Sequence, residues 1–85
     1  MGNYSIQIRR SAENEIERLP TRDQKKVIEK IRSLRQDPRP SGVKKLSGEE
    51  KYRLRQGSYR ILYEVHDAMV TVVVVKVADR KDAYR

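Results

Sequence analysis

The sequence predicts an α+β domain in which a hairpin of two helices packs on one face of an antiparallel four-stranded sheet. Three observations predict this class: an alternating segment at residues 4–9, two segments of helical period between residues 11 and 36, and three strand-like runs between residues 51 and 77. The element order is therefore β-α-α-β-β-β. A chain of 85 residues can bury one thin hydrophobic core, so we expect residues 1–85 to form a single domain.

Two short helices are predicted from apolar spacing and from the residues at their ends. Ser11 is a suitable N-cap for the first helix, whose apolar positions recur at 12, 16 and 19 before Pro20 ends it. Thr21 and Gln24 fit a capping box for the second helix, which carries an apolar stripe at positions 27, 28, 31 and 34. That helix has to end before Pro38, because the residue before a proline disfavours helical conformation.

Three strands are expected after a loop. Residues 37–50 concentrate prolines and glycines, which predicts a connecting loop there. Residues 51–56 and 59–65 alternate apolar and polar side chains, and the tight turn at Gly57 predicts that they pair as a hairpin. The valine-rich run at residues 69–77 is typical of a central strand covered on much of both faces. The helices would cover one face of the sheet and leave the other open for function.

The chain is strongly basic and lacks several kinds of chemical group. Its 20 lysines and arginines against 12 acidic residues give a formal net charge of +8, so polyanions or an acidic protein are the natural partners. The lack of cysteine and the single histidine exclude thiolate and histidine-cluster metal sites, and we expect neither a metal nor a cofactor. No segment has the length of a membrane span or the apolar core of a signal peptide, so we expect a cytoplasmic protein without membrane contact.

Strand alternation places basic side chains together on the open face of the predicted sheet. If the apolar residues of the 51–56 strand face the helices, Lys51, Arg53 and Arg55 point outward together. Arg60 falls on the same face of the paired strand. Like charges opposite one another are destabilising, so three converging arginines indicate a site for an anion. A solvated basic strand face is the alternative interpretation.

The C-terminal segment adds Arg80, Lys81 and Tyr84 directly after the valine-rich strand. A tyrosine ring can stack on an exposed base while guanidinium groups bind phosphate, a combination that suits single-stranded RNA. A frayed polar tail is the alternative interpretation of these terminal residues.

Three motifs together resemble the RelE/ParE toxin superfamily. Residues 52–65, YRLRQGSYRILYEV, are similar to the signature hairpin of that family. Residues 79–84, DRKDAY, resemble its closing motif, and residues 44–48, KKLSG, resemble its loop. The resemblance extends over essentially the whole chain and favours the RelE-like mRNA interferase branch.

This resemblance implies a toxin of a toxin–antitoxin pair that cuts mRNA in the ribosomal A site and so inhibits translation. The reaction it implies needs no metal, because a ribose 2′-hydroxyl attacks the adjacent phosphate. The implied partners are a cognate antitoxin protein, mRNA and the ribosome with its rRNA. The residues implied to be catalytic are Arg53, Arg55, Arg60, Arg80 and Tyr84. The residues expected to bind RNA around them are Lys44, Lys45, Lys51, Lys81 and Arg85.

The general base of this reaction is an open question at the level of the sequence. Members of the family often have lysine where this chain has Arg53 and Arg55, and a guanidinium stays protonated at neutral pH. Tyr84 is one candidate base. Asp79 is more suited to a salt bridge with the neighbouring cations, and His66 to a surface turn.

Two alternative functions compete with the ribonuclease. The first is a ParE-like inhibitor of DNA gyrase, although ParE-like chains generally lack the full arginine and tyrosine set. The second is a non-catalytic basic module that binds the ribosome or its RNA.

Overall fold

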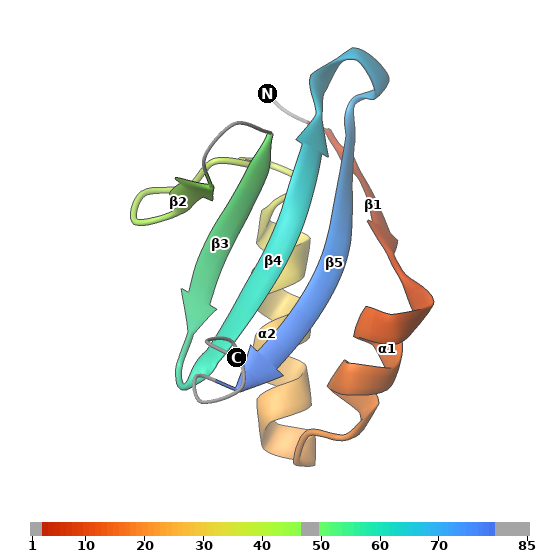
Figure 1. Cartoon of the computed structure of the whole chain (residues 1–85), viewed down its shortest axis with the longest axis vertical. Helices are drawn as coiled ribbons and strands as arrows, with labels where there is room; N and C mark the ends of the chain where they lie inside the picture. Colours follow the sequence, from red (N-terminus) through yellow and green to blue (C-terminus); the bar gives the residue numbers. More distant parts are fainter. Residues whose placement is uncertain (1–2, 47–49, 80–85) are drawn as a thin grey trace.

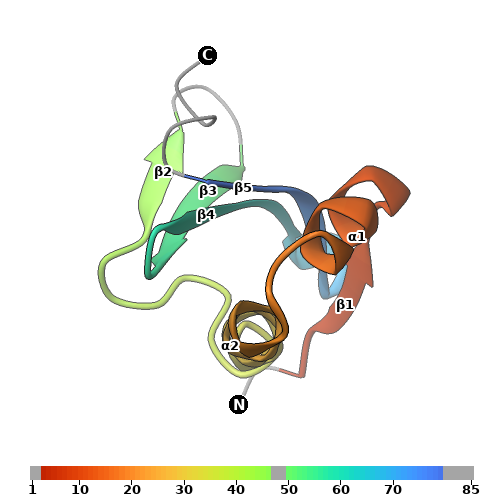
Figure 2. The same cartoon turned by 90° about the horizontal axis from the view of Figure 1, so that it is seen from below.

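The computed structural model describes residues 3–46 and 50–79, which form a sheet with both helices on one side (Figures 1 and 2). The strands among these residues are β1 (Ser5–Ile8), β2 (Lys44–Leu46), β3 (Lys51–Gln56), β4 (Tyr59–His66) and β5 (Thr71–Asp79). The helices are α1 (Arg10–Glu17), α2 (Thr21–Ser33) and a short 3₁₀ turn, η1 (Asp67–Met69). None of the helices described is long and apolar enough to cross a membrane.

The α+β class and the one-sided helix layer are confirmed, whereas the sheet differs from the prediction in two respects. Among the described residues it has five strands, in the order β1-β5-β4-β3-β2, and β1 runs parallel to β5. The parallel pair arises because the two helices carry the chain back across the sheet before it continues into the hairpins. The fifth strand, β2, lies in the expected loop, where three residues are too few for an alternating pattern to be visible.

The hydrophobic core lies between the helices and the inner face of the sheet. Ala12 and Ile16 of α1 and Val27 and Ile31 of α2 are buried, so both predicted apolar stripes are confirmed. The sheet contributes the buried side chains of Tyr52, Leu54, Ile61, Tyr63, Val65, Val72, Val74 and Val77. This alternation along β3 and β4 agrees with the expected inner and outer rows.

The predicted helix caps are wrong at both N-termini. The N-cap residues are Arg9 and Pro20, neither with a side-chain cap, and Ser11 and Thr21 lie inside the helices. Gln24 instead reaches back with Nε2 to the carbonyl oxygens of Glu17, at 3.1 Å, and Leu19, at 2.8 Å. It therefore closes the turn between the two helices by satisfying carbonyl groups left over at the end of α1.

The last strand differs in range from the prediction, and its pairing with β4 contains an irregularity. The register changes between Leu62 and Tyr63, and β5 extends over Thr71–Asp79 instead of residues 69–77. Glu15 of α1 supports this region, because its Oε1 accepts the backbone N–H of Val77 at 2.9 Å. The pairing of β1 with β5 ends at Ile8 and Val74, so β5 continues beyond β1 and α1 supplies an acceptor for Val77 there.

Candidate active site

The outer face of the sheet carries the basic row that strand alternation predicts. Tyr52 and Leu54 are buried on the inner face, so Arg53 and Arg55 of β3 lie on the outer face. Gly57, with φ of +59°, begins the tight turn to β4 and brings Arg60 directly opposite Arg55. Glycine suits this position because the left-handed region costs it no steric strain.

These cations line a hollow of about 330 Å³. We call it the basic hollow; the described residues that line it are Gly42, Lys44, Arg53, Arg55 and Arg60. They come from the loop before β2 and from three neighbouring strands. Among them there is no acidic side chain, so the described wall of the hollow is wholly cationic or neutral.

The strand register sets like charges against each other inside the hollow. Lys44 is the partner of Arg53 across β2 and β3, and Arg55 is the partner of Arg60 across β3 and β4. Directly opposed like charges destabilise a sheet. An anion bound in the hollow would relieve this repulsion and accept forked hydrogen bonds from the guanidinium groups.

Arg60 differs from the other cations because it is buried, with 2% of its surface exposed. The sequence predicts its face but not this burial. It lies opposite Arg55 on one side and Ala78 of β5 on the other. A guanidinium withdrawn from water acts on a nearby anion with less dielectric screening than one at the surface.

The remaining predicted residues lie outside the hollow or outside the described part of the chain. Lys45 lies 3.4 Å from Glu50, and Lys51 is opposite Leu46 and Glu64. Neither lines the hollow: Lys45 is paired with the inward-facing Tyr52 and so lies on the other face of the sheet, whereas Lys51 lies on the outer face two residues before Arg53. The other four predicted residues lie beyond the described ranges: Arg80, Lys81, Tyr84 and Arg85.

The two side chains considered for proton transfer or pairing lie at opposite ends of the sheet. His66 ends β4, with Nε2 2.9 Å from Glu64, and six residues of strand, roughly 20 Å, separate it from Arg60. Asp79 ends β5 opposite Tyr59, at the same end of β4 as Arg60. His66 is exposed at the strand end, in agreement with a surface position.

Two tyrosines anchor the site to the rest of the fold. The Tyr59 hydroxyl donates to Asp23 of α2 at 2.8 Å, and this hydrogen bond raises the pKa of Tyr59. The hydroxyl of the buried Tyr63 donates to the carbonyl of Pro38 at 2.7 Å, and burial raises the pKa of Tyr63. Both phenols therefore remain neutral hydrogen-bond donors at physiological pH.

Sequence reasoning missed Gly42, which adopts φ of +90° in the loop that borders the hollow. The glycine marked this segment as a turn, but nothing in the local pattern indicated which face of the sheet the turn approaches. Only the pairing of β2 with β3 places it beside the arginines.

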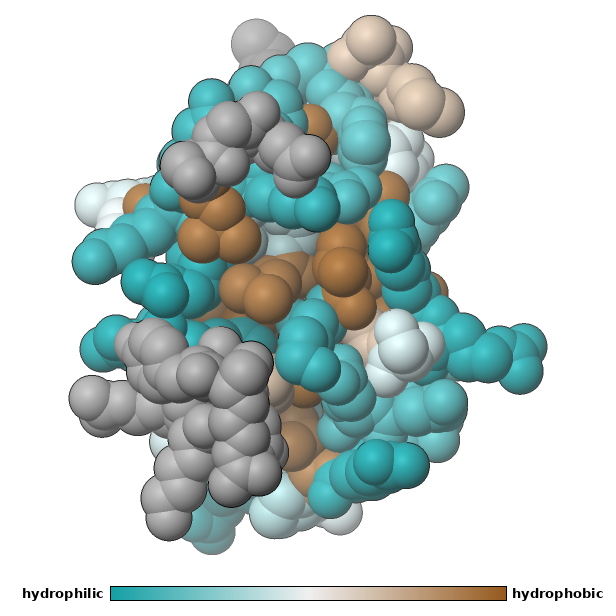
Figure 3. All heavy atoms as spheres, in the orientation of Figure 1, coloured by the Kyte–Doolittle hydropathy of each residue, from teal (hydrophilic) through white to brown (hydrophobic). Residues whose placement is uncertain are grey.

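An apolar area adjoins the basic residues on the outer face. Brown side chains gather over the middle of β4 and β5 in Figure 3. Alternation and register assign Leu62, Val73 and Val75, all half-buried, to this area. A surface that combines apolar and cationic parts suits either RNA bases with phosphates or an amphipathic protein segment.

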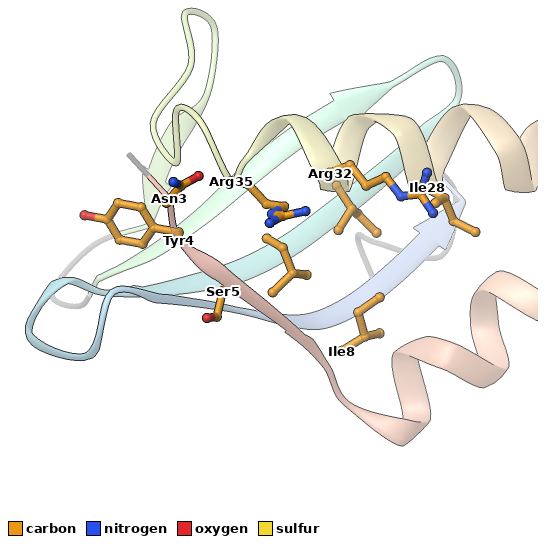
Figure 4. A pocket seen from close by; sticks show the side chains of 9 residues that line it. Asn3, Tyr4, Ser5, Ile8, Ile28, Arg32 and Arg35 are labelled. Atoms are coloured by element: carbon orange, nitrogen blue, oxygen red, sulfur yellow. The ribbon is translucent and has the colours of Figure 1, made fainter. Parts of the chain in front are cut away.

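A larger cavity, of about 580 Å³, lies between β1 and α2 on the helix side (Figure 4). Its floor is apolar, with Ile6 and Ile8 from β1 and Ile28 from α2, and Arg32 and Arg35 border it. It lacks the converging charges of the basic hollow, so we place the candidate active site at the hollow and not at this cavity.

Comparison with known proteins identifies a family that covers most of the chain. The chain matches a family model described as ParE toxin of type II toxin–antitoxin system, parDE, over residues 6–84. It is 31% identical over 86 residues to toxin RelG of Mycobacterium tuberculosis, a match that covers 96% of this chain and 97% of RelG.

Solved structures resemble the fold over most of its length. The RelBE2 toxin–antitoxin complex of Mycobacterium tuberculosis matches with a TM-score of 0.81 and 30% identity, over 92% of this chain and 99% of that chain. The intact RelBE toxin–antitoxin complex of E. coli matches with a TM-score of 0.79 and 26% identity, over 89% of this chain and 95% of that chain. The chain therefore belongs to the RelE/ParE family of toxins of type II toxin–antitoxin systems.

Proposed function

We propose that this toxin is an endoribonuclease that cuts mRNA in the A site of the ribosome and thereby stops translation in the cytoplasm. The observation that carries the proposal is the basic hollow, in which Lys44, Arg53, Arg55 and Arg60 line a cavity with no described acidic side chain. Four cations that line one hollow on the outer face of the sheet suit a phosphate of an extended RNA strand.

The proposed reaction uses the substrate's own nucleophile. The 2′-oxygen of a ribose forms a bond to the adjacent phosphorus while the bond from phosphorus to the 5′-oxygen breaks. The products are a 2′,3′-cyclic phosphate and a free 5′-hydroxyl. Negative charge gathers on the phosphorane transition state, and preorganised guanidinium groups stabilise this charge without needing a metal.

We assign Arg60 to the scissile phosphate, because its burial gives it the least screened charge in the hollow. Arg53, Arg55 and Lys44 would hold the phosphates on either side. Arg80 and Tyr84 stay proposed members of the site, for the leaving group and the substrate base respectively. The proton of the 2′-hydroxyl would pass to the tyrosinate form of Tyr84 or to a group supplied by the ribosome, because arginine does not accept it. The departing 5′-oxygen would take a proton from that group or from water.

A cognate antitoxin is the proposed protein partner. The relatives of known structure include toxin–antitoxin complexes, RelBE2 of Mycobacterium tuberculosis and RelBE of E. coli. An antitoxin with acidic and apolar side chains would match the basic hollow and the adjoining apolar area and would block access of RNA.

Primer extension on a defined mRNA held in purified 70S ribosomes tests the proposal. We expect new 5′-ends within the A-site codon when the protein is added, and a terminal 2′,3′-cyclic phosphate on the upstream product. Naked mRNA under the same conditions should stay intact. Absence of new ends with folded protein, at any concentration, would contradict the proposed activity.

Inhibition of DNA gyrase is the second candidate, because the family model that matches bears the ParE name. Gyrase, supercoiled DNA and the protein incubated together should yield no stabilised DNA breaks if the ribonuclease proposal is right. Accumulated breaks, with no cleavage of ribosome-bound message, would favour the gyrase function instead.

A further inference from the structure

A cluster of side chains joins the loop after α2 to β3 and to the turn between β4 and β5. At its centre, Arg39 donates from Nε to the Tyr52 hydroxyl at 2.7 Å and from Nη2 to Glu50 at 3.0 Å. Its two terminal nitrogens donate to the two carboxylate oxygens of Asp67, at 3.2 and 2.8 Å. The guanidinium also lies 5.3 Å from the centre of the Tyr52 ring. We call Arg39, Glu50, Tyr52 and Asp67 the Arg39 clamp.

The loop held by this clamp passes from the inner side of the sheet to the outer side. Its start is fixed on the inner side, where the carbonyl of Pro38 accepts from the buried Tyr63 at 2.7 Å. A few residues later Gly42 and Lys44 line the basic hollow on the outer face. The chain therefore passes round the β2 edge of the sheet between residues 38 and 44 (Figure 2).

The clamp is also joined to β2 itself. Glu50 accepts from Arg39 with Oε2 at 3.0 Å and lies 3.4 Å from the Lys45 ammonium with Oε1. Lys44, the neighbour of Lys45, lines the hollow opposite Arg53. β2 has three residues and lies at the edge of the sheet, so few ladder hydrogen bonds hold it in place. Its position consequently depends on what holds the loop before it.

We propose that Arg39 is a positioning residue of the basic hollow: the clamp holds the 38–44 segment so that Lys44 faces the anion bound there. The identity of that anion, an RNA phosphate, rests on the proposed function. The clamp itself lies apart from the hollow, and none of its four residues lines it. Arg39 thus acts through Lys44 and not by contact with the RNA.

A double-mutant cycle in RNA binding tests the coupling between these two residues. The probe is a short fluorescent single-stranded RNA, and its affinity is measured by anisotropy for the wild type, Arg39→Ala, Lys44→Ala and the double variant. Each single change should weaken binding by about three- to tenfold, the scale of one lost phosphate contact. The double variant should bind no worse than Lys44→Ala, because Arg39 has nothing left to position. Effects that multiply in the double variant would overturn the proposal.

Removal of a clamp carboxylate distinguishes an effect of positioning on RNA affinity from an effect of net charge. Glu50→Ala makes the protein more positive, so long-range electrostatics alone would tighten RNA binding. Positioning predicts the opposite, a weaker complex, because the link from Arg39 to β2 is lost. Glu29→Ala is the matched control: Glu29 is exposed on α2, away from the clamp, and its removal changes the net charge equally. Tighter binding by both variants would contradict the positioning role.

A charge control and a fallback variant keep the result interpretable. Arg22→Ala removes an exposed cation of α2 and measures the loss of affinity that charge alone causes. If Arg39→Ala does not fold at the assay temperature, Glu50→Ala with its control decides the question. Because binding is measured without cleavage, a protein that cuts no message but shows the coupling would refute the proposed ribonuclease and leave the clamp's role intact.

Discussion

Val70 is the one described residue other than glycine that adopts a positive φ, at 48°. A β-branched side chain is strained in this region, which costs roughly 1–2 kcal/mol for an ordinary residue. Both backbone groups are nevertheless used: its N–H donates to the carbonyl of Asp67 at 3.1 Å, and its carbonyl accepts from Ser5 at 2.9 Å. The turn between β4 and β5 therefore keeps this conformation at the expense of stability.

Val70→Asn should stabilise the protein. Asparagine tolerates the left-handed region, and the side chain of Val70 is 45% exposed, so little burial is lost. We expect a gain of about 1 kcal/mol in the free energy of unfolding, or a rise in Tm of about 4–8 °C for a domain of this size, measured by thermal denaturation. Met69→Asn, at an exposed neighbour with ordinary φ, should change Tm little; equal shifts for both variants would contradict strain at Val70.

Two carboxylates of the Arg39 clamp make the stability of the fold depend on pH in the acid range. Hydrogen bonds from Arg39 and Tyr4 hold the pKa of Asp67 below its usual range, and those from Tyr52 and Arg39 do the same for Glu50. A carboxyl whose pKa is lower in the folded state stabilises the fold above its unfolded pKa, about 4. That contribution to stability is lost as the pH falls through the lowered pKa values of Asp67 and Glu50 in the folded protein.

Asp67→Asn should therefore make Tm depend less steeply on pH below neutrality. Measured between pH 2 and pH 7, the Tm of the variant should be lower than that of the wild type near neutrality and should approach it at the acid end. Glu29→Gln, which also removes a carboxylate but lies exposed on α2 outside the clamp, is the comparison. A constant difference between Asp67→Asn and wild type across the whole range would show that ionisation of Asp67 contributes nothing.

At the scale of single residues, short-range patterns were predictable and long-range partners were not. Arg53, Arg55 and Arg60 follow from strand alternation and one tight turn, so the sequence predicts their common face. The partners of Arg39 lie 11 to 28 residues away along the chain and come from different elements. No local spacing could indicate that they meet.

Among the elements, β5 is held by α1 where it continues beyond its pairing with β1. Glu15 accepts the backbone N–H of Val77 with Oε1 and the ammonium of Lys76 with Oε2, both at 2.9 Å. Glu15→Ala leaves the partly buried N–H of Val77 without this partner, so we expect a loss of about 1–3 kcal/mol in the free energy of unfolding by urea. Glu17→Ala, at an exposed position of the same helix, should cost little. Equal losses for the two would mean that β5 does not need the carboxylate.

The elements themselves show what apolar periodicity can predict. Both helices and the β3–β4 hairpin appear where the spacing of apolar residues predicts them, because burial on one face dictates that spacing. β2 was not predicted, because its three residues are too few to show an alternating pattern of apolar and polar side chains. The parallel partner of β1 was also missed, because direction of pairing depends on the path of the chain and not on local pattern.

For the whole molecule, the separation of charge on its surface matters more than the net charge of +8. The acidic residues Glu50 and Asp67 both pair with Arg39 in the clamp, whereas the described lining of the basic hollow has no acid. The formal charge was visible in the composition and indicated polyanions as partners. The concentration of positive charge in one hollow depends on the register of β2, β3 and β4, and that register cannot be predicted from composition.

The rate of mRNA cleavage in one turnover, measured for three proteins, tests the central claim most directly. Ribosomes programmed with a defined message are mixed with saturating wild-type protein, Arg60→Ala or Arg22→Ala, after each is shown to fold. Loss of the buried guanidinium should slow cleavage by about 10²–10³-fold, whereas loss of the exposed Arg22 should leave the rate nearly unchanged. Equal rates for Arg60→Ala and the wild type would contradict the assignment of the basic hollow as the active site.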